Sequence, residues 1–359
     1  MQPRPQRTGM LLILVAAVLW GTTGTAATFA PDVSPIAIGA TAMGFGGLLQ
    51  AVIALRLIRQ SGRRLLQRWR VVALGALAVT IYPLAFYSSM HLAGVAVGTV
   101  VSIGSAPIFA AVIERLADRH RLTRRWAAGA GLGIAGAVLL CLAEPAGSAG
   151  GTAVNPELGV GLGLVAGLTY ALYSWAAHRV IAAGVPTRAA MGAMFGAAGL
   201  ALMPVVLVTG STLLSSWANA SVGIYMALVP MFAGYLLFGM GLAWARASTA
   251  IVLTLVEPVV AALLAVVIVG EQLPPLGWAG VALIASSLIS LTVRARGVDS
   301  SDTGALPGER APFGASATAV AVALAESGRG RESTVGRTRL RSTPPPNGNR
   351  SSGPDRLET

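Results

Sequence analysis

The sequence predicts an all-α integral membrane protein with ten transmembrane helices, arranged as two inverted five-helix repeats. Three observations predict this fold class. The chain of 359 residues is 54% hydrophobic and only 11% charged, whereas about a quarter of the residues of a soluble protein are charged. Long apolar runs recur along the chain, and its two halves resemble each other when the sequence is shifted by about 150 positions.

Ten apolar runs are each long enough to cross a hydrocarbon core about 30 Å thick as a helix. The runs are continuous and lack the alternating pattern of membrane barrel strands, so helices are predicted. They cover residues 9–30, 35–57, 70–91, 94–114, 125–143, 157–180, 188–209, 221–243, 248–269 and 275–293.

Arginine predicts the orientation, because basic residues near short loops stay on the cytoplasmic side. The net charge is +12, and residues 1–296 contain eighteen Arg against seven acidic residues. With a cytoplasmic N-terminus, all eighteen fall in cytoplasmic segments. The positive charge is thus explained by membrane insertion, so the lipid bilayer is the expected partner and no nucleic acid is expected. The outer loops carry Asp32, Glu144, Glu157 and Glu271.

The internal repeat fixes how the two halves are inserted. Ser105–Ala111 aligns with Val256–Ala262 after one inserted residue, and Leu14–Ala16 aligns with Leu164–Ala166. Each half has five helices, an odd number, so equivalent helices cross the membrane in opposite directions. Many secondary transporters are built this way, with substrate held between the halves near mid-membrane.

The first run has an alternative interpretation as a cleaved signal peptide, with Thr28-Phe29-Ala30 as a poor cleavage site. Its apolar core exceeds the roughly 7 to 15 residues usual in a signal. The repeat pairs helix one with helix six, which favours its retention.

These patterns divide the chain into five parts. The last part is rich in Gly, Ser, Pro, Arg and Thr and is expected to be a disordered cytoplasmic tail. The parts are a cytoplasmic N-terminus at 1–8, a first repeat at 9–143, an external linker at 144–156, a second repeat at 157–296 and the tail at 297–359.

Several motifs resemble those of a known family. The second half contains Leu255-Val256-Glu257-Pro258-Val259-Val260-Ala261-Ala262, followed by Gly270-Glu271-Gln272-Leu273 and Gly277-Trp278-Ala279-Gly280, and the first half contains Trp20-Gly21-Thr22 and Ala106-Pro107-Ile108-Phe109-Ala110-Ala111. With these residues the chain resembles the ten-helix branch of the drug/metabolite transporter superfamily, with two EamA domains, over about residues 9–296. One departure is His120, which stands where the family often has a glutamate.

The resemblance implies transport of small organic solutes such as amino acids, nucleobase-like metabolites or amphiphilic drugs, frequently by export. Together with the arginine pattern, it implies a multi-pass protein of the cell (inner) membrane with both termini in the cytoplasm.

Glu257 is the strongest candidate for a substrate or proton site, because it is the one acidic residue well inside an apolar run. Pro258 follows it directly and is expected to kink the helix. The alternative is a protonated Glu257 that only steadies this kink. Pro107 is the equivalent helix-kink candidate in the first half, with an ordinary tolerated membrane proline as its alternative.

Aromatic and hydroxyl side chains within the runs are candidates to line a cavity, because each joins an apolar face to a polar tip. Anchoring at the lipid interface and plain packing are the alternatives. Trp20, Tyr82 and Tyr173 are placed on the substrate or proton pathway. The wider set contains Tyr87, Ser88, Ser89, Tyr170, Ser174, Trp175 and Tyr235.

The remaining polar residues suggest no metal site and no cofactor. Glu114 is expected to form an interfacial pair with Arg115, and the three His are widely separated, unlike metal ligands. The Gly159, Gly163 and Gly167 series is expected to allow close helix packing. Since such faces also serve packing between chains, the sequence is compatible with a homodimer as well as with a monomer.

The leading hypothesis is a secondary transporter for a small-molecule substrate, an amino-acid-like or amphiphilic solute, working by alternating access. The competing hypothesis is a membrane-embedded enzyme acting on a lipid or isoprenoid substrate, with Asp32 or Glu144 among its acids. Such an enzyme needs clustered His, Asp, Glu or a metal, which the scattered acids do not suggest. A receptor or assembly factor is a third possibility for which the inverted repeat is unnecessary.

Overall fold

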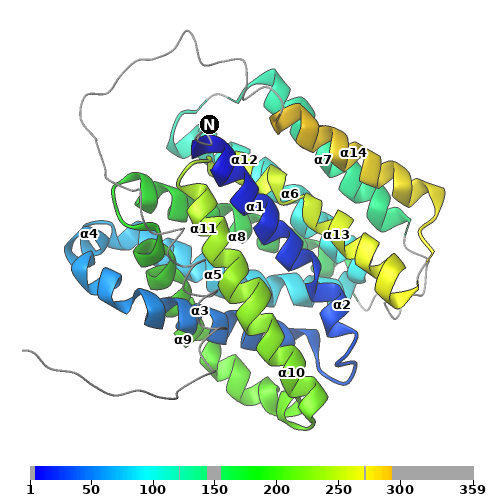
Figure 1. The fold of residues 1–359 in the computed structure, drawn as a ribbon, viewed down its shortest axis with the longest axis horizontal. Helices are drawn as coiled ribbons and strands as arrows, with labels where there is room; N and C mark the ends of the chain where they lie inside the picture. Colours follow the sequence, from blue (N-terminus) through cyan, green and yellow to red (C-terminus); the bar gives the residue numbers. More distant parts are fainter. Residues whose placement is uncertain (1–4, 121, 144–154, 271, 293–359) are drawn as a thin grey trace, which may run out of the picture. The chain divides into compact units, whose positions relative to one another are not determined.

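The computed structural model describes residues 5–120, 122–143, 155–270 and 272–292 (Figure 1). Within these ranges the regular structure is entirely helical. The predicted tail at 297–359 lies outside the described residues, as do most of the predicted linker, Glu144 and Glu271.

The first half contains five membrane-length helices, of which the first is interrupted. A short helix, α4, connects the second to the third. The elements are α1 (Pro5–Gly21) with α2 (Thr23–Ala27), α3 (Pro35–Gln60), α4 (Gly62–Gln67), α5 (Trp69–Ala93), α6 (Val95–Ala117) and α7 (Arg124–Leu142).

The second half repeats this plan, with interruptions in its third and fourth membrane helices. Its elements are α8 (Pro156–Ala182), α9 (Thr187–Thr209) with the 3-10 turn η1 (Gly210–Leu214), α10 (Trp217–Met226), the π-helical segment η2 (Ala227–Gly234), α11 (Tyr235–Leu242), α12 (Ala247–Leu253), α13 (Val256–Leu264), the π-helical turn η3 (Ala265–Val269) and α14 (Pro275–Thr292).

The predicted ten-helix membrane architecture is confirmed. Nine helical stretches of the described ranges are apolar and long enough to cross a bilayer, and the tenth apolar helix, Pro275–Leu291, is shorter. The spans begin and end within a few residues of the predicted runs. Their outer surface is apolar, as lipid requires: Leu207 is 83% and Val267 79% exposed.

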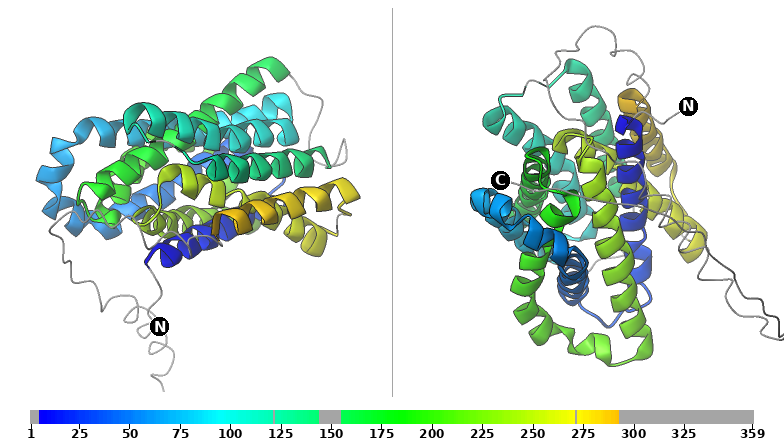
Figure 2. Two further views of the ribbon diagram at one scale, coloured as in Figure 1. Left: turned by 90° about the horizontal axis from the view of Figure 1, so that it is seen from above. Right: turned by 60° about the vertical axis from the view of Figure 1, so that its left-hand side comes forward.

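The helix contacts follow the internal repeat. α3 packs along its counterpart α9, and α7 packs along its counterpart α14; the latter pair lies side by side in Figure 1 and again in Figure 2. In addition, helices three and four of the first half, α5 and α6, pack against α8. Their counterparts in the second half pack against α1 in the same way; these are η2 with α11 in helix eight, and α12 with α13 in helix nine. Exchanging the halves therefore maps one set of contacts onto the other, as an inverted two-repeat transporter requires.

The arginine-rich end of the bundle comprises the helix ends near Gln60, Ala117, Ala182 and Leu242. Every arginine in the described ranges lies at or near this end. Contacts join the segments there: Arg64 to the Gly184 carbonyl (2.8 Å), Arg179 to Asp118, His178 Nδ1 to the Leu242 carbonyl (2.8 Å), and Arg125 to the Ser290 carbonyl. The opposite end carries Asp32 and Glu157, both exposed.

Glycines allow the counterpart helices to touch through their backbones. A Cβ on Gly136 of α7 would lie 2.7 Å from the Gly280 carbonyl oxygen and 2.9 Å from the Ile284 nitrogen in α14. Gly159, Gly163 and Gly167 of α8 likewise face α5 and α6, which confirms the predicted packing role of this series.

Replacing Gly136 by alanine tests this packing. We expect Gly136→Ala to destabilise the protein by about 1 to 3 kcal/mol, because backbone atoms must separate to admit the methyl group. A methyl group on Gly131 of the same helix would meet no atom within 4 Å, so Gly131→Ala serves as the matched control. Thermal unfolding of the purified variants measures both; equal melting temperatures would contradict the packing assignment.

Candidate functional site

A cavity lies between the two halves, next to the middle of the bundle and towards the end opposite the arginine-rich end. Both halves contribute to it. The first half provides helix one (α1 with α2), helix two (α3) and helix three (α5). The second half provides helix six (α8), helix eight (α10, η2 and α11) and helix nine (α12, α13 and η3). The cavity is lined by Trp20, Thr23, Gly39, Met43, Tyr82, Pro83, Phe86, Tyr87, Tyr170, Met231, Tyr235 and Glu257. Its volume is about 40 Å³, which is room for a few water molecules but not for an organic solute. Entry of a solute therefore requires the helices to move apart.

Interrupted helices surround this cavity. In helix nine, Pro258 has no N–H to bond the Thr254 carbonyl, and the Glu257 N–H bonds that carbonyl instead at 2.9 Å. The helix consequently breaks at residues 254–255, between α12 and α13. In helix one, α1 ends where the hydroxyls of Thr22 and Thr23 donate hydrogen bonds to backbone carbonyls. Thr22 donates to the Leu19 carbonyl at 2.6 Å, and Thr23 donates to the Trp20 carbonyl at 2.7 Å.

Helices one, eight and nine are thus interrupted within the predicted apolar runs, and the break in helix nine lies beside Pro258. In helix eight the π-helical segment η2 contains Pro230, and the Pro230 carbonyl accepts a hydrogen bond from Trp20 Nε1 at 2.9 Å. Such segments and broken helices are common at the binding sites of membrane transporters. Pro107, the equivalent of Pro258, lies inside α6, which runs without a break from Val95 to Ala117.

Glu257 is the one charged residue among those that line the cavity. It lies in the first turn of α13, where the helix dipole favours a negative charge. Within the described part of the chain, its carboxylate has no hydrogen-bonding or ion-pairing partner from the protein. A buried charge without a partner is costly, and this cost is offset when a proton or a cation binds.

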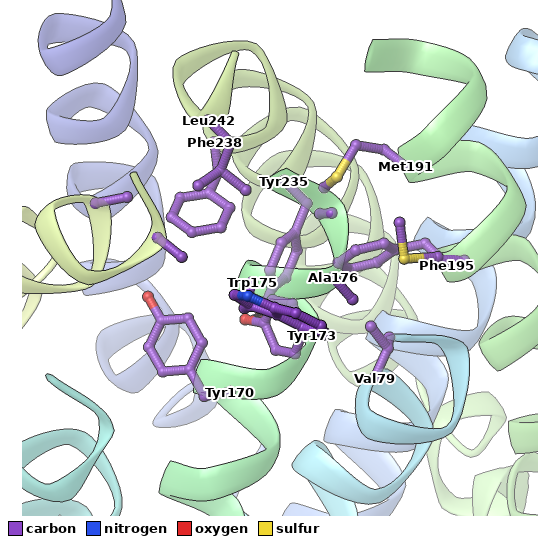
Figure 3. Close-up of a cluster of buried hydrophobic side chains, with 14 of the residues drawn as sticks. Val79, Tyr170, Tyr173, Trp175, Ala176, Met191, Phe195, Tyr235, Phe238 and Leu242 are labelled. Carbon is purple, nitrogen blue, oxygen red and sulfur yellow. Dashed lines mark hydrogen bonds between the residues drawn. The ribbon is translucent and has the colours of Figure 1, made fainter. Parts of the chain in front are cut away.

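Five of the six tyrosines of the chain belong to one aromatic cluster around the cavity. Figure 3 shows Tyr170 and Tyr173 of α8 close to Tyr235 and Phe238 of α11. The ring centroids of Tyr82 and Tyr170 lie 5.6 Å apart, and those of Trp20 and Tyr235 lie 4.7 Å apart. The rings therefore bring both halves of the chain into one contiguous wall.

The pathway residues and the kink residue Pro258, all predicted from the sequence, occupy three kinds of position. Trp20, Tyr82 and Glu257 line the cavity. Tyr173 is only 1% exposed and lies behind the wall, with its hydroxyl 3.1 Å from that of Tyr235. Pro258 is buried at the helix break beside Glu257.

Of the wider predicted set, Tyr87, Tyr170 and Tyr235 also line the cavity, and the others do not. Ser89 donates to the Gly159 carbonyl at 2.7 Å, and Trp175 donates to Asp118 at 2.8 Å. Sequence reasoning missed the other six lining residues, which are Thr23, Gly39, Met43, Pro83, Phe86 and Met231.

Glu114 corrects a prediction, because it is not at the interface. It is only 1% exposed, and its carboxylate accepts hydrogen bonds from the Ser248 N–H (3.0 Å) and the Ser248 hydroxyl (2.7 Å). It thereby satisfies a donor at the N-terminus of α12. This contact joins α6 of the first half to α12 of the second and closes the arginine-rich end.

The described ranges contain no group of three or more His, Cys, Asp and Glu placed to hold a metal ion. Asp32, one of the two acids named for an enzyme, is exposed at the end opposite the arginine-rich end, and Glu144 lies outside the described residues.

Gly21 holds α1 close to Glu257. A Cβ on Gly21 would lie 2.6 Å from Val260 Cβ and 2.9 Å from the Glu257 carbonyl oxygen. We expect Gly21→Ala to push α1 away from α13. Because such a displacement costs about 1 to 2 kcal/mol, the initial rate of transport should fall about tenfold. Gly24→Ala is the control, because a methyl group there meets no atom within 4 Å. Initial rates in proteoliposomes decide, and equal rates for both variants would contradict the contact's importance.

Comparison with known proteins identifies the family. The family described as the EamA-like transporter family matches the chain twice, at residues 7–142 and 157–293. A protein of Bacillus subtilis (strain 168), named Uncharacterized transporter YwfM, is 32% identical over 289 residues, covering 80% of this chain and 94% of that protein. A crystal structure with 22% identity has the same fold, with a TM-score of 0.66 over 82% of this chain and 99% of that chain.

Three findings agree with one another. The two family matches together span most of the described bundle, the relative is named as a transporter, and the cavity is shared by the two repeats. This chain is therefore a multi-pass membrane transporter and belongs to the EamA-like transporter family.

Proposed function

We propose that this protein is a secondary transporter that moves a small organic metabolite, amino-acid-like or amphiphilic, by alternating access. The observation that carries the proposal is the position of Glu257: a carboxylate without a protein partner among the described residues, in a cavity built by both repeats. A site shared by two inverted halves can be exposed to either side when one half moves against the other.

The closed end of the bundle supports this mechanism. Glu114 with Ser248, and Asp118 with Trp175 and Arg179, connect the halves at the arginine-rich end. The cavity lies towards the opposite end. In the proposed cycle these contacts break when the arginine-rich end opens, and the ring contacts around the cavity close in exchange.

We further propose that the arginine-rich end faces the cytoplasm, because basic residues are retained there on insertion. The N-terminus then lies in the cytoplasm, the protein resides in the cell (inner) membrane, and the C-terminus is placed on the same side. Export is the proposed direction, following the resemblance of the chain to drug and metabolite exporters.

Counterflow in proteoliposomes tests the transport proposal. The full-length protein is reconstituted with a loaded solute inside, and uptake of the same labelled solute is followed for a panel of amino acids and amphiphilic amines. A carrier gives saturable uptake that is accelerated by solute on the far side. Linear flux with no such acceleration would indicate a channel and contradict alternating access.

A further inference from the structure

We propose that the site described above selects an organic cation, with an ammonium group on a flat apolar body, over a zwitterion or an anion. This inference rests on the proposed transport function and narrows its substrate class. It follows from three properties of the cavity wall: its charge, its hydrogen-bonding groups and its rings.

Any net charge that the wall carries is negative. Glu257 is the one carboxylic acid among the twelve described residues that line the cavity, and none of these residues is basic. An ammonium group bound beside Glu257 neutralises the carboxylate. A carboxylate on the cargo would instead add a second negative charge without a basic partner in this wall.

Half of the six N–H and hydroxyl donors in the wall already have acceptors in the protein. Thr254 donates its hydroxyl proton to the Ile251 carbonyl at 2.8 Å, so the 2.7 Å contact between Tyr170 and Thr254 uses the Tyr170 proton. Thr23 donates to the Trp20 carbonyl, and Trp20 donates to the Pro230 carbonyl.

Three donors of the wall are thus already committed to protein acceptors. The oxygen lone pairs of Thr23 and Tyr170, and both oxygens of Glu257, stay available to accept from a cargo. The hydroxyls of Tyr82, Tyr87 and Tyr235, the last of them 3.1 Å from the Tyr173 hydroxyl, can donate to an anion but cannot neutralise it. An ammonium group, which only donates, fits this inventory better than a carboxylate does.

The rings favour the same charge. Trp20, Tyr82, Phe86, Tyr87, Tyr170 and Tyr235 all line the cavity, and the face of an aromatic ring attracts a cation, most strongly where water is excluded. The same faces stack on a flat apolar body. A cation attached to such a body therefore satisfies the carboxylate and the rings together.

Matched probes with one ring system and different head groups test the proposal. Tryptamine, L-tryptophan and indole-3-propionate are a cation, a zwitterion and an anion, and 2-phenylethylamine, L-phenylalanine and 3-phenylpropionate repeat the series on a smaller ring. Equilibrium dialysis of each labelled probe against the purified full-length protein measures binding. We expect the amine of each series to bind at least about tenfold more tightly than its partners.

Variants assign the preference to the wall. Glu257→Gln, which keeps the size of the side chain, is expected to remove the advantage of the amine, and the exposed Glu157→Gln to keep it. Tyr82→Phe keeps the ring face, so its affinity for the amine is expected to stay within about threefold of the parent protein. Tyr82→Leu removes the ring, and its affinity for the amine is expected to fall about tenfold. Melting temperatures confirm that each variant is folded.

The outcomes separate this inference from the transport proposal. Zwitterion or anion binding that equals amine binding, or amines that do not bind saturably, would overturn the cation preference, even where counterflow of another solute stands. Saturable, Glu257-dependent amine binding without counterflow of any solute would instead support the cation site and overturn the carrier.

Discussion

Glu257→Gln is expected to lower the initial rate of counterflow about a hundredfold. Glutamine keeps the length of the side chain and can still accept a hydrogen bond, so the break beside Pro258 should persist. What it removes is the negative charge, and interactions with a charged group contribute about 1.5 to 3 kcal/mol, where each 1.4 kcal/mol is about a factor of ten. The measurement is the rate in proteoliposomes at matched protein density.

Two controls interpret the result. Glu157→Gln makes the same chemical change at an exposed position of the opposite end and should transport within about twofold of the parent protein. Glu257→Asp keeps the charge and shifts it, so an intermediate rate is expected. Glu257→Gln that folds and transports at more than half the parent rate would mean that Glu257 only steadies the interrupted helix.

Glu114→Ala is expected to open the arginine-rich end. Both hydrogen bonds of the Glu114 carboxylate go to Ser248, and the alanine variant leaves these two donors buried without an acceptor. Losing two bonds to a charged acceptor costs about 3 kcal/mol or more. Because the bonds connect the two halves, this cost falls on the state in which that end is closed, and a shift of about a hundredfold towards the open state follows.

Cysteine labelling measures this opening. The chain has one cysteine, Cys141, so Cys141→Ala gives a background in which the buried Ala250 of α12 is replaced by cysteine. A membrane-impermeant maleimide added from the arginine-rich side should react much faster in Glu114→Ala than in the parent. Arg115→Gln, an exposed change next in sequence, is the control, and Ser248→Ala, which removes one of the two bonds, should give a smaller increase. Unchanged labelling in Glu114→Ala would remove Glu114 from the gate.

Much of the fold is predictable from local patterns. The length of an apolar run reports a span because the bilayer has a fixed thickness, and eighteen arginines on alternate loops report the number of spans. Glu257 and Pro258 also stand out in the sequence, because an acid and a proline are both unfavourable inside a membrane helix.

The missed features depend on partners far away in the sequence. Glu114 follows an apolar run and precedes Arg115, which locally indicates an interface, but it is buried by Ser248, 134 positions away. The π-helical segment around Pro230 is stabilised by Trp20, 210 positions away. Met43 reaches the cavity only because α3 packs against η2, and no pattern within its own helix distinguishes it from packing residues.

The most direct test of the account is the access to the cavity itself. With Cys141→Ala as background, Met43→Cys places a thiol in the cavity wall, and its reaction with an impermeant maleimide is measured separately from each side of the membrane. Alternating access around a shared cavity predicts reaction from both sides, with Glu114→Ala raising the rate from the arginine-rich side and lowering it from the other. Rates that rise together from both sides, or reaction from one side only in every variant, would contradict it.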